Sequence, residues 1–317
     1  MWNVALSTMW GIKRFERLGD FFTAGREAGF TRFELNHGVN SAMLDGVRLN
    51  GFNITSIHEP CPADVSVAEL KKRDWLISAT DEENRKRGVE AVRRSIDLAR
   101  ELGAQVVIVH PGRVNMDESL ENALTKMYRQ GQANTPEYVQ VRERMFAERA
   151  GLADAHVQAV RRSLGELAEH AARQGIRLGL ENRDHYYEIP LLDELDYLLG
   201  QGYGETVGYW HDVGHAHKSQ FKGYGPHEEW LKRFAHKIIG VHLHDLVGMD
   251  DHLPAGQGQM DWALVARYLP AEVLRTCEFQ HRTLPEEVAA GARWLAENLS
   301  CGGNGVGIPS TVKKTAV

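Results

Sequence analysis

Short runs of apolar residues, many of them β-branched, alternate along this chain with longer segments of mixed character. Such runs are typical of strands that are buried on both faces of a parallel sheet. We expect eight strands, at residues 3–7, 31–35, 54–58, 104–110, 176–181, 207–212, 238–242 and 273–278.

Several of the intervening segments have helical periodicity. In residues 89–102 an apolar side chain recurs every three or four positions, and Gly103 follows where the helix would end. We expect helices at residues 15–28, 89–102, 157–173 and 286–298.

Strands that alternate with helices indicate a parallel sheet, and we expect it to close into a single (β/α)8 TIM barrel of the α/β class. Closure is inferred because side chains that can bind metals end the third to the eighth strand, and these would converge only around a ring. The alternative is an open, doubly wound sheet, which is disfavoured because no GxGxxG or phosphate-binding loop follows any of the strands. A barrel takes about 250 residues, so residues 1–299 are expected to form one catalytic domain.

Two segments depart from the repeat of strand and helix. Residues 113–154 form a long polar insertion after the fourth strand, expected to be partly helical. Because loops that follow barrel strands surround the site, one interpretation is a lid, and another is a solvated or oligomer-forming decoration. Residues 300–317 are rich in Gly, Ser and Thr, and we expect a flexible tail that adds nothing to the core.

The composition of the 317 residues, 43% hydrophobic and 25% charged with a net charge of −6, is that of an ordinary globular enzyme. The acidic balance argues against non-specific binding to nucleic acid or to anionic membranes.

The three cysteines, Cys61, Cys277 and Cys301, have no paired spacing and suit a reducing cytoplasm. No secretion signal is recognisable at the N-terminus, and no apolar stretch approaches the roughly 18 residues that span a bilayer. We therefore expect a cytoplasmic protein, and whether it forms homo-oligomers stays open.

Candidate metal ligands end most of the later strands or follow them closely. A single histidine in an apolar run is more often a hydrogen-bonded core residue, but a carboxylate that ends a buried strand is costly unless it is paired or bound to a metal. The joint occurrence of nine such residues in barrel order favours a metal site. They are His58, His110, Glu181, Asp212, His215, His242, Asp250, His252 and Glu278.

Imidazole and carboxylate ligands without thiolates suit Zn²⁺, Mn²⁺, Co²⁺ or Fe²⁺. Four ligands satisfy one ion, whereas nine are natural for two or three ions that share bridging carboxylates. Glu181 and Asp212 are the candidates for bridging. The cofactor is therefore expected to be one to three divalent ions per chain.

The chain resembles the xylose isomerase-like TIM-barrel superfamily, which contains sugar isomerases and epimerases and also endonuclease IV. The resemblance covers most of the chain from the third strand to the eighth. The segments that carry it are HEP at 58–60, VHPG at 109–112, LEN at 180–182, DVGH at 212–215, HLHD at 242–245, DDHLPAGQGQMDW at 251–262 and CEF at 277–279.

The resemblance implies two possible metal centres. Sugar epimerases of the superfamily hold one ion, and the matching residues here are Glu181, Asp212, His242 and Glu278. Endonuclease IV holds three zinc ions with five more ligands, which correspond to His58, His110, His215, Asp250 and His252. Its DNA-reading features are not matched, because Glu59-Pro60-Cys61-Pro62 stands after His58 in place of a basic or aromatic loop.

The first functional hypothesis is a sugar or sugar-phosphate isomerase or epimerase that acts through a metal-stabilised enediolate. Glu181 and Glu278 would transfer the proton as acid and base, and His215 would hydrogen-bond a substrate hydroxyl. Residues just beyond the strand ends would hold hydroxyls or a phosphate; these are Asn182, Arg183, His185, Lys218 and Arg282.

The second hypothesis is a multinuclear phosphodiesterase or related hydrolase, which would use all nine ligands. A third is a metal-binding protein without catalysis, which would leave the two glutamates without a purpose. We favour the isomerase or epimerase, with a small-molecule partner, a sugar or a phosphorylated compound, and with neither nucleic acid nor a membrane. Glu34, Asn36 and His37, around the end of the second strand, are left open between a substrate contact and an ordinary polar turn.

Overall fold

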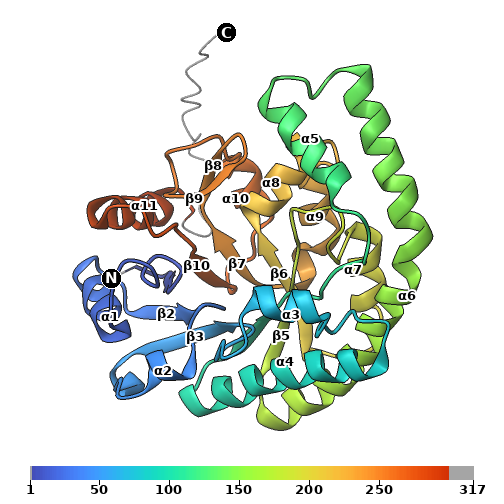
Figure 1. Ribbon diagram of the computed structural model, residues 1–317. Coiled ribbons are helices and arrows are strands. Elements are labelled where there is room, and N and C mark those ends of the chain that lie inside the picture. Colours follow the sequence, from blue (N-terminus) through green and yellow to red (C-terminus); the bar gives the residue numbers. More distant parts are fainter. Residues whose placement is uncertain (1, 300–317) are drawn as a thin grey trace.

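The strands of the computed structural model, which describes residues 2–299, close into a barrel around the centre of the molecule (Figure 1). Every neighbouring pair is parallel, in the order β1-β10-β7-β6-β5-β4-β3-β2. The predicted eight-stranded TIM barrel is confirmed. Its strands are β1 (Ala5–Ser7), β2 (Arg32–Leu35), β3 (Asn53–His58), β4 (Val106–Val109), β5 (Arg177–Glu181), β6 (Val207–Asp212), β7 (Ile238–Leu243) and β10 (Leu274–Cys277). The predicted tail, 300–317, lies outside the described residues.

The barrel strands are buried on both faces, which is why they read as continuous apolar runs. All residues of β4, β6 and β7 are buried. Inside the barrel the indole of Trp210 packs with Val106, Ile108 and Ile239. This apolar layer lies below the polar strand ends, since the Trp210 ring contacts that of His242 at a centroid distance of 5.2 Å.

Helices surround the barrel, and local sequence signals set their ends. Asp81 caps the longest of the regular connecting helices by accepting the N–H of Asn84, and Gly103 ends it in the left-handed conformation, at φ 73°. None of the helices in residues 2–299 is long and apolar enough to cross a membrane. The helices outside the insertion are α1 (Leu18–Glu27), α2 (Ser41–Leu44), α3 (Val67–Arg73), α4 (Glu82–Leu102), α7 (Leu192–Leu199), α8 (Val213–Phe221), α9 (His227–Phe234), α10 (Trp262–Tyr268) and α11 (Pro285–Asn298), with short 3₁₀ turns η1 (Leu49–Gly51) and η2 (Ala235–Lys237).

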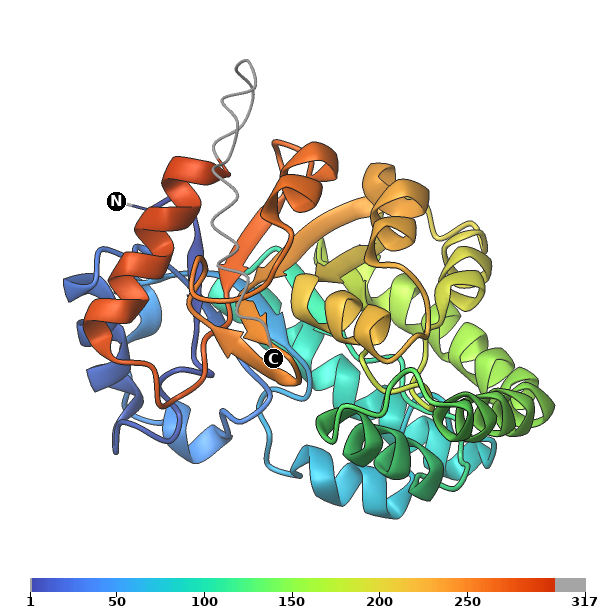
Figure 2. The same cartoon turned by 90° about the horizontal axis from the view of Figure 1, so that it is seen from above.

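The predicted insertion is a helical hairpin. Its first helix is α5 (Ser119–Arg129), and its second continues into the helix predicted at 157–173, so that one helix, α6 (Pro136–Gln174), runs for 39 residues. We call α5 and the first half of α6 the insertion hairpin; it projects to one side of the molecule in both ribbon views (Figures 1 and 2). The periodicity of α6 was recognised only where the helix packs on the barrel, because its first half packs on α5 instead.

The insertion hairpin has a small apolar core of its own. Its buried members include Leu124 and Tyr138, and they pack against Tyr186 after β5 and Tyr224 after α8. The phenol of Tyr138 also donates to the backbone carbonyl of Lys222 at 3.0 Å. The hairpin is therefore attached beside the barrel mouth through the loop that follows β5 and the segment that follows α8, and its movement as a lid stays a prediction.

A two-stranded ribbon, β8 (Asp245–Val247) and β9 (Asp250–Leu253), follows β7 and was not predicted. The buried carboxylate of Asp245 organises it by accepting hydrogen bonds from the backbone of Leu246, Gly256 and Met260 and from the indole of Trp262, at 2.9–3.1 Å. The final aspartate of the HLHD segment is thus fully occupied by the loop it anchors. Because that loop carries His252, Asp245 helps to shape the site.

Replacing Gly240 by alanine should destabilise the protein. A Cβ at this position of β7 would lie 2.0 Å from the ring of Trp210, which has no free space inside the barrel. Overpacking of this kind costs about 1–3 kcal/mol or more, so the urea midpoint should fall. Gly165→Ala is the control: this glycine of α6 has open space around its Cβ position, and alanine should stabilise the helix by about 0.5–1 kcal/mol. Equal effects of the two substitutions would contradict the described packing of Trp210.

Candidate metal centre

Four side chains from four strand ends converge at the barrel mouth, and we call them the central group: Glu181, Asp212, His242 and Glu278. All are buried, and one ligand atom of each lies within 4.8 Å of the others. Nδ1 of His242 lies 2.9 Å from Glu181, 3.5 Å from Asp212 and 3.3 Å from Glu278. Three carboxylates are therefore buried around one imidazole nitrogen, which requires positive charge among them.

The orientation of His242 is set by Glu34 on β2. Nε2 of His242 donates to Glu34 Oε1 at 3.2 Å, and Glu34 Oε2 accepts a hydrogen bond from Ser56. With its proton on Nε2, the neutral ring turns the lone pair of Nδ1 toward the three carboxylates, as a metal ligand would. The sequence leaves Glu34 undecided because it lies inside the strand, one residue before the buried Leu35, and so does not end an apolar run as Glu181 and Glu278 do.

The pKa values of these residues reflect their burial and their charges. Burial alone lowers the pKa of His242, but Glu278 and Glu34 raise it well above its ordinary value. For Glu278, burial raises the pKa, but His242 and His252 lower it to about 2. Without an ion, His242 is thus protonated and Glu278 ionised, and a metal ion would bind Nδ1 by displacing its proton.

A second set of ligand atoms, the first flanking group, consists of His58, His110 and Glu181. His58 ends β3 and His110 follows β4, and their Nε2 atoms lie 3.4 and 2.5 Å from Glu181 Oε2. The guanidinium of Arg183 enters the same group: its Nη1 lies 2.7 Å from His110 Nε2 and 2.8 Å from Glu181 Oε2. The structure thus brings both predicted histidines together, with an arginine among them.

A third set, the second flanking group, consists of His215, Asp251 and His252. Nδ1 of His215 donates to the carbonyl of Asn182 at 3.0 Å, which leaves Nε2 free to accept or coordinate. His252 has its ring between Asp251, 3.1 Å from Nδ1, and Glu278, 3.4 Å from Nε2. Its backbone is left-handed, at φ 60°, an uncommon conformation outside glycine that occurs at functional sites.

Asp251 stands in this group where Asp250 was expected. The side chain of Asp250 is 59% exposed, and its carboxylate binds Arg282 at 2.6 Å on the surface. The reason is the left-handed turn at His252, which breaks the alternation of β9 and directs consecutive side chains to the mouth. Arg282, 60% exposed and paired with Asp250, likewise lies apart from the cluster.

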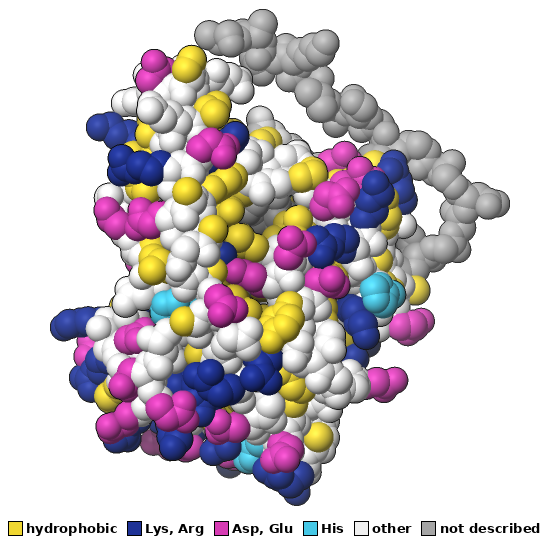
Figure 3. Space-filling model, turned by 90° about the vertical axis from the view of Figure 1, so that its right-hand side faces the viewer, with side chains coloured by type: hydrophobic (Ala, Val, Ile, Leu, Met, Phe, Trp, Pro, Cys, Tyr) yellow, Lys and Arg dark blue, Asp and Glu magenta, His cyan; other side chains and the backbone are white. Residues whose placement is uncertain are grey.

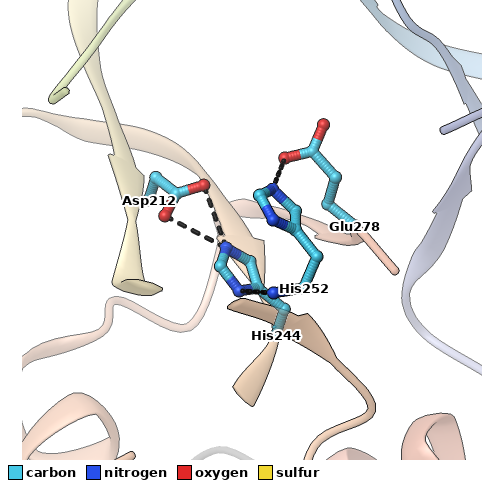
Figure 4. Close-up of side chains that lie close together, drawn as sticks. All are labelled: Asp212, His244, His252 and Glu278. Carbon is cyan, nitrogen blue, oxygen red and sulfur yellow. Dashed lines mark hydrogen bonds and ion pairs between the residues drawn. The ribbon is translucent and has the colours of Figure 1, made fainter. Parts of the chain in front are cut away.

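His244 belongs to the site and was missed by sequence reasoning. Its Nδ1 accepts the backbone N–H of His252, so the proton is on Nε2, which lies 3.1 Å from Asp212 and donates to it (Figure 4). The rings of His244 and His252 stack at 4.2 Å. A usable signal was its spacing, because residues two apart along a strand share a face and His242 already faced the mouth.

Asn182 supports the site from behind. Its amide donates to the carbonyl of Asp212, and its Oδ1 accepts from the N–H of Asp212 and from the phenol of Tyr209, at 2.8–3.0 Å. All three contacts are buried, so the side chain positions Asp212, and its role as a substrate contact stays a prediction. His185, another predicted contact on this loop, is 41% exposed and lies 3.3 Å from Glu121 of the insertion hairpin.

A chain of ion pairs connects the insertion hairpin to the mouth. Nζ of Lys218 lies 2.7 Å from Asp184 and 2.8 Å from Asp251. Nζ of Lys222 lies 3.0 Å from Glu121 on α5 and donates to the carbonyl of Asp184 at 2.8 Å. All five side chains are mostly buried. The hairpin thus helps to set the position of Lys218.

Beside this chain lies a cavity of about 250 Å³, lined by Tyr186, Leu191, Tyr224 and Trp230, with Arg183 on one side. Figure 3 faces α6 and α7 and shows hydrophobic side chains in a hollow beside the column of the insertion hairpin. Tyr186 and Tyr224 also pack in the apolar core of the insertion hairpin, so the cavity lies between the hairpin and the barrel.

The donor set fits a divalent ion at the central group. Oxygen and imidazole nitrogen atoms converge without a thiolate, since the nearest cysteine in sequence, Cys277, is buried and its thiol pKa is raised by burial. Such ligands suit Zn²⁺, Mn²⁺, Co²⁺ or Fe²⁺. Glu181, Asp212, His242 and Glu278 are the residues that would hold it.

The chain belongs to the xylose isomerase-like TIM barrel family, whose model matches residues 22–298. It is 27% identical over 197 residues to an uncharacterised protein of Methanocaldococcus jannaschii, MJ1311; the match covers 61% of this chain and 55% of that relative. It thus spans about half the length of the curated relative it matches.

Among solved structures, a D-tagatose 3-epimerase-like protein superposes with a TM-score of 0.66 at 20% identity, over 94% of this chain and 97% of the other. The IOLI protein with a bound zinc atom superposes with a TM-score of 0.62 at 14% identity, over 94% and 98%. At these low sequence identities, the superpositions show that the folds are alike and nothing more.

Glu34→Gln should weaken metal binding without unfolding the protein. The amide still accepts a hydrogen bond from His242 but no longer supplies the negative charge that makes Nδ1 a strong ligand. Loss of such a partner typically costs 10–100-fold in metal affinity, measurable by competition with a chelating dye. Glu27→Gln, an exposed position on α1, is the control. An unchanged metal affinity in Glu34→Gln would show that His242 does not bind the ion.

Asp184→Asn should destabilise the protein in a pH-dependent manner. Burial raises the pKa of Asp184, but Lys218 and Lys222 hold it well below the ordinary 3.8. A carboxylate with a lowered folded pKa stabilises the protein above its unfolded pKa, and this contribution is lost as the pH falls through the folded value. The cost should be about 3 kcal/mol at pH 7 and should shrink below about pH 4.

Urea unfolding of both proteins across this pH range measures the difference. Asp193→Asn, at a side chain that is 93% exposed, is the control and should show almost no effect. A difference that stays constant down to pH 2 would contradict the ion-pair chain.

Proposed function

We propose that the protein is a divalent-metal-dependent isomerase or epimerase of a sugar or sugar phosphate. The observation that carries the proposal is the central group itself. Two glutamates from β5 and the end of β10, Glu181 and Glu278, face the same nitrogen of His242 from different strands, 2.9 and 3.3 Å away. A small substrate bound between them would have a carboxylate near either face of one carbon atom.

A divalent ion at the central group would supply electrophilic stabilisation of the enediolate that forms when a proton leaves the carbon beside a carbonyl. The chain's own residues would handle the proton. Glu278, ionised because its pKa is lowered to about 2, would accept the proton from carbon. The C–H electron pair would become the new C=C bond, and the carbonyl oxygen would take the negative charge.

Return of a proton completes the reaction. Glu278 would return its proton to the neighbouring carbon, which moves the carbonyl and is isomerisation. Inversion of the same carbon needs a proton on the opposite face. Burial raises the pKa of Glu181, but Arg183 and His110 hold it well below its ordinary value, so Glu181 would first take a proton from His58, whose Nε2 lies 3.4 Å from its Oε2.

His215, with Nδ1 held by the carbonyl of Asn182, would offer Nε2 to a substrate hydroxyl. The fold shared with a D-tagatose 3-epimerase-like protein supports this reaction class.

A metal-dependent phosphoester hydrolase is the second candidate. The two flanking groups favour it, because together with the central group they make up three of the five clusters of ligand atoms among the described residues. Multinuclear hydrolases use neighbouring ions to activate water and to stabilise the leaving oxygen. The net charge of −6 supports a small phosphoester rather than nucleic acid as its substrate.

Removing one charge from the central group should abolish metal retention and activity together. We expect Glu181→Gln and Asp212→Asn to lose the ion on elemental analysis and at least about 10²-fold in rate. The circular dichroism spectrum should stay native, because the barrel core lies below these residues. Glu286→Gln, exposed on α11, is the control. Full metal content in either site variant would refute the assignment of ligands.

The reaction class can be tested by hydrogen exchange. Free and phosphorylated ketoses are incubated in D₂O with the protein loaded with Zn²⁺, Mn²⁺ or Co²⁺, and NMR detects deuterium at the carbon beside the carbonyl. We expect incorporation with at least one sugar and none with Glu278→Gln. Hydrolysis of bis-p-nitrophenyl phosphate without any exchange would instead support the second candidate.

A further inference from the structure

We propose that Arg183 and Lys218 are built-in cations that take the places of additional metal ions, so that the site holds a single divalent ion. Each side chain places its charge in one of the two flanking groups. The inference rests on the proposed ion at the central group, and it decides how many further ions the chain accepts.

Arg183 uses the ligand atoms of the first flanking group. Its Nη1 lies 2.7 Å from His110 Nε2 and 2.8 Å from Glu181 Oε2, which are two of the three ligand atoms of that group; the third belongs to His58. A metal ion would need to lie about 2.0–2.2 Å from both. Nη1 already lies at a short distance from both atoms, so an ion and the guanidinium would compete for one position.

The guanidinium is anchored from the opposite side. Nε of Arg183 lies 3.2 Å from Glu188 Oε2, and the other oxygen of Glu188 is 3.0 Å from Lys71. Glu188 is buried, and the side chain of Arg183 is only 12% exposed. Arginine cannot lose its charge under these conditions. The positive charge is therefore a fixed part of the first flanking group.

Lys218 has the same relation to the second flanking group. Its ammonium lies 2.8 Å from Asp251 Oδ2, while the other oxygen of Asp251 lies 3.1 Å from His252 Nδ1. Both oxygens of the group's only carboxylate are therefore already paired. The second partner of Lys218 is Asp184, at 2.7 Å, which Lys222 and the insertion hairpin hold in place.

The charge of the central group is compatible with one ion. One divalent ion and the guanidinium of Arg183 carry as much positive charge as the three carboxylates of the central group, Glu181, Asp212 and Glu278, carry negative charge. Two further buried carboxylates lie next to this group: Glu34 contacts His242, and Glu188 is shared between Arg183 and Lys71.

Further divalent ions would add positive charge where Arg183 and Lys218 already stand. Buried like charges at such short range repel strongly, so further ions are excluded from the two flanking groups. The two remaining clusters of ligand atoms, one with His244 and His252 and one with His58 and His242, both use Glu278 of the central group and would compete with the ion there.

Metal stoichiometry tests this inference directly. The protein is loaded with excess Zn²⁺ or Co²⁺ and passed through a desalting column, and the metal per chain is measured by elemental analysis. We expect one ion in the wild type, two in Arg183→Met and two in Lys218→Met. Methionine keeps the length of the side chain and removes its charge, which frees His110 and Glu181 in one variant and Asp251 in the other.

Two matched controls remove or keep a charge elsewhere. Arg282→Met removes a surface guanidinium that pairs with the exposed Asp250, and it should leave one ion. Arg183→Lys keeps the positive charge and should also leave one ion. If Arg183→Met and Arg183→Lys both bound two ions, geometry rather than charge would set the count and the inference would be overturned.

The remaining outcomes are distinguishable. Two or three ions in the wild type overturn the inference and support the hydrolase, and this result does not depend on whether any variant folds. One ion in the wild type and one in both methionine variants overturns the inference but leaves the proposed function intact. No ion in the wild type at saturating metal refutes the central group as a metal site, and with it both proposals.

Discussion

The structure depends on the burial of several carboxylates around the single imidazole of His242. Burial without compensation would be prohibitive for Glu181, Asp212 and Glu278, since ionised carboxylates strongly prefer water. The parallel barrel imposes this arrangement, because it directs the carboxyl ends of all its strands to one mouth. Positive charge at the mouth is therefore a condition for a stable native state.

Residues around the central group mainly hold its members in position. Asn182 fixes the backbone of Asp212, His244 donates to its carboxylate, and Glu34 sets the ring of His242. Asp245 shapes the loop that delivers His252 to the mouth. Ligand groups that are oriented by such hydrogen bonds bind an ion without further ordering, which is how outer partners strengthen a metal site.

The sequence predicts most of the barrel and the central group because both depend on one local pattern. A buried strand reads as an apolar run, and a ligand at its end interrupts that run, as at Glu181 and Asp212; the strands agree with their predicted ranges to within about two residues. The two-residue spacing of His244 from His242 was a usable signal, but Asp251 had none, because its direction is set by a loop, through the hydrogen bonds of Asp245 and the left-handed backbone of His252. Such long-range geometry leaves no periodicity in the chain.

The competing functional hypotheses arose because the ligand count points to several ions and the family contains mononuclear enzymes. The positions of the positive side chains bear on this conflict more directly than the number of ligands does. His110 is a residue type that binds metals, but its Nε2 already faces the guanidinium of Arg183, so no position for an ion is open beside it. The same holds for Asp251, whose two oxygens face an ammonium and an imidazole. Counting residues that can bind metals overestimates the number of ions wherever the chain supplies its own cations, and on this ground we favour proton transfer at one ion over hydrolysis at several.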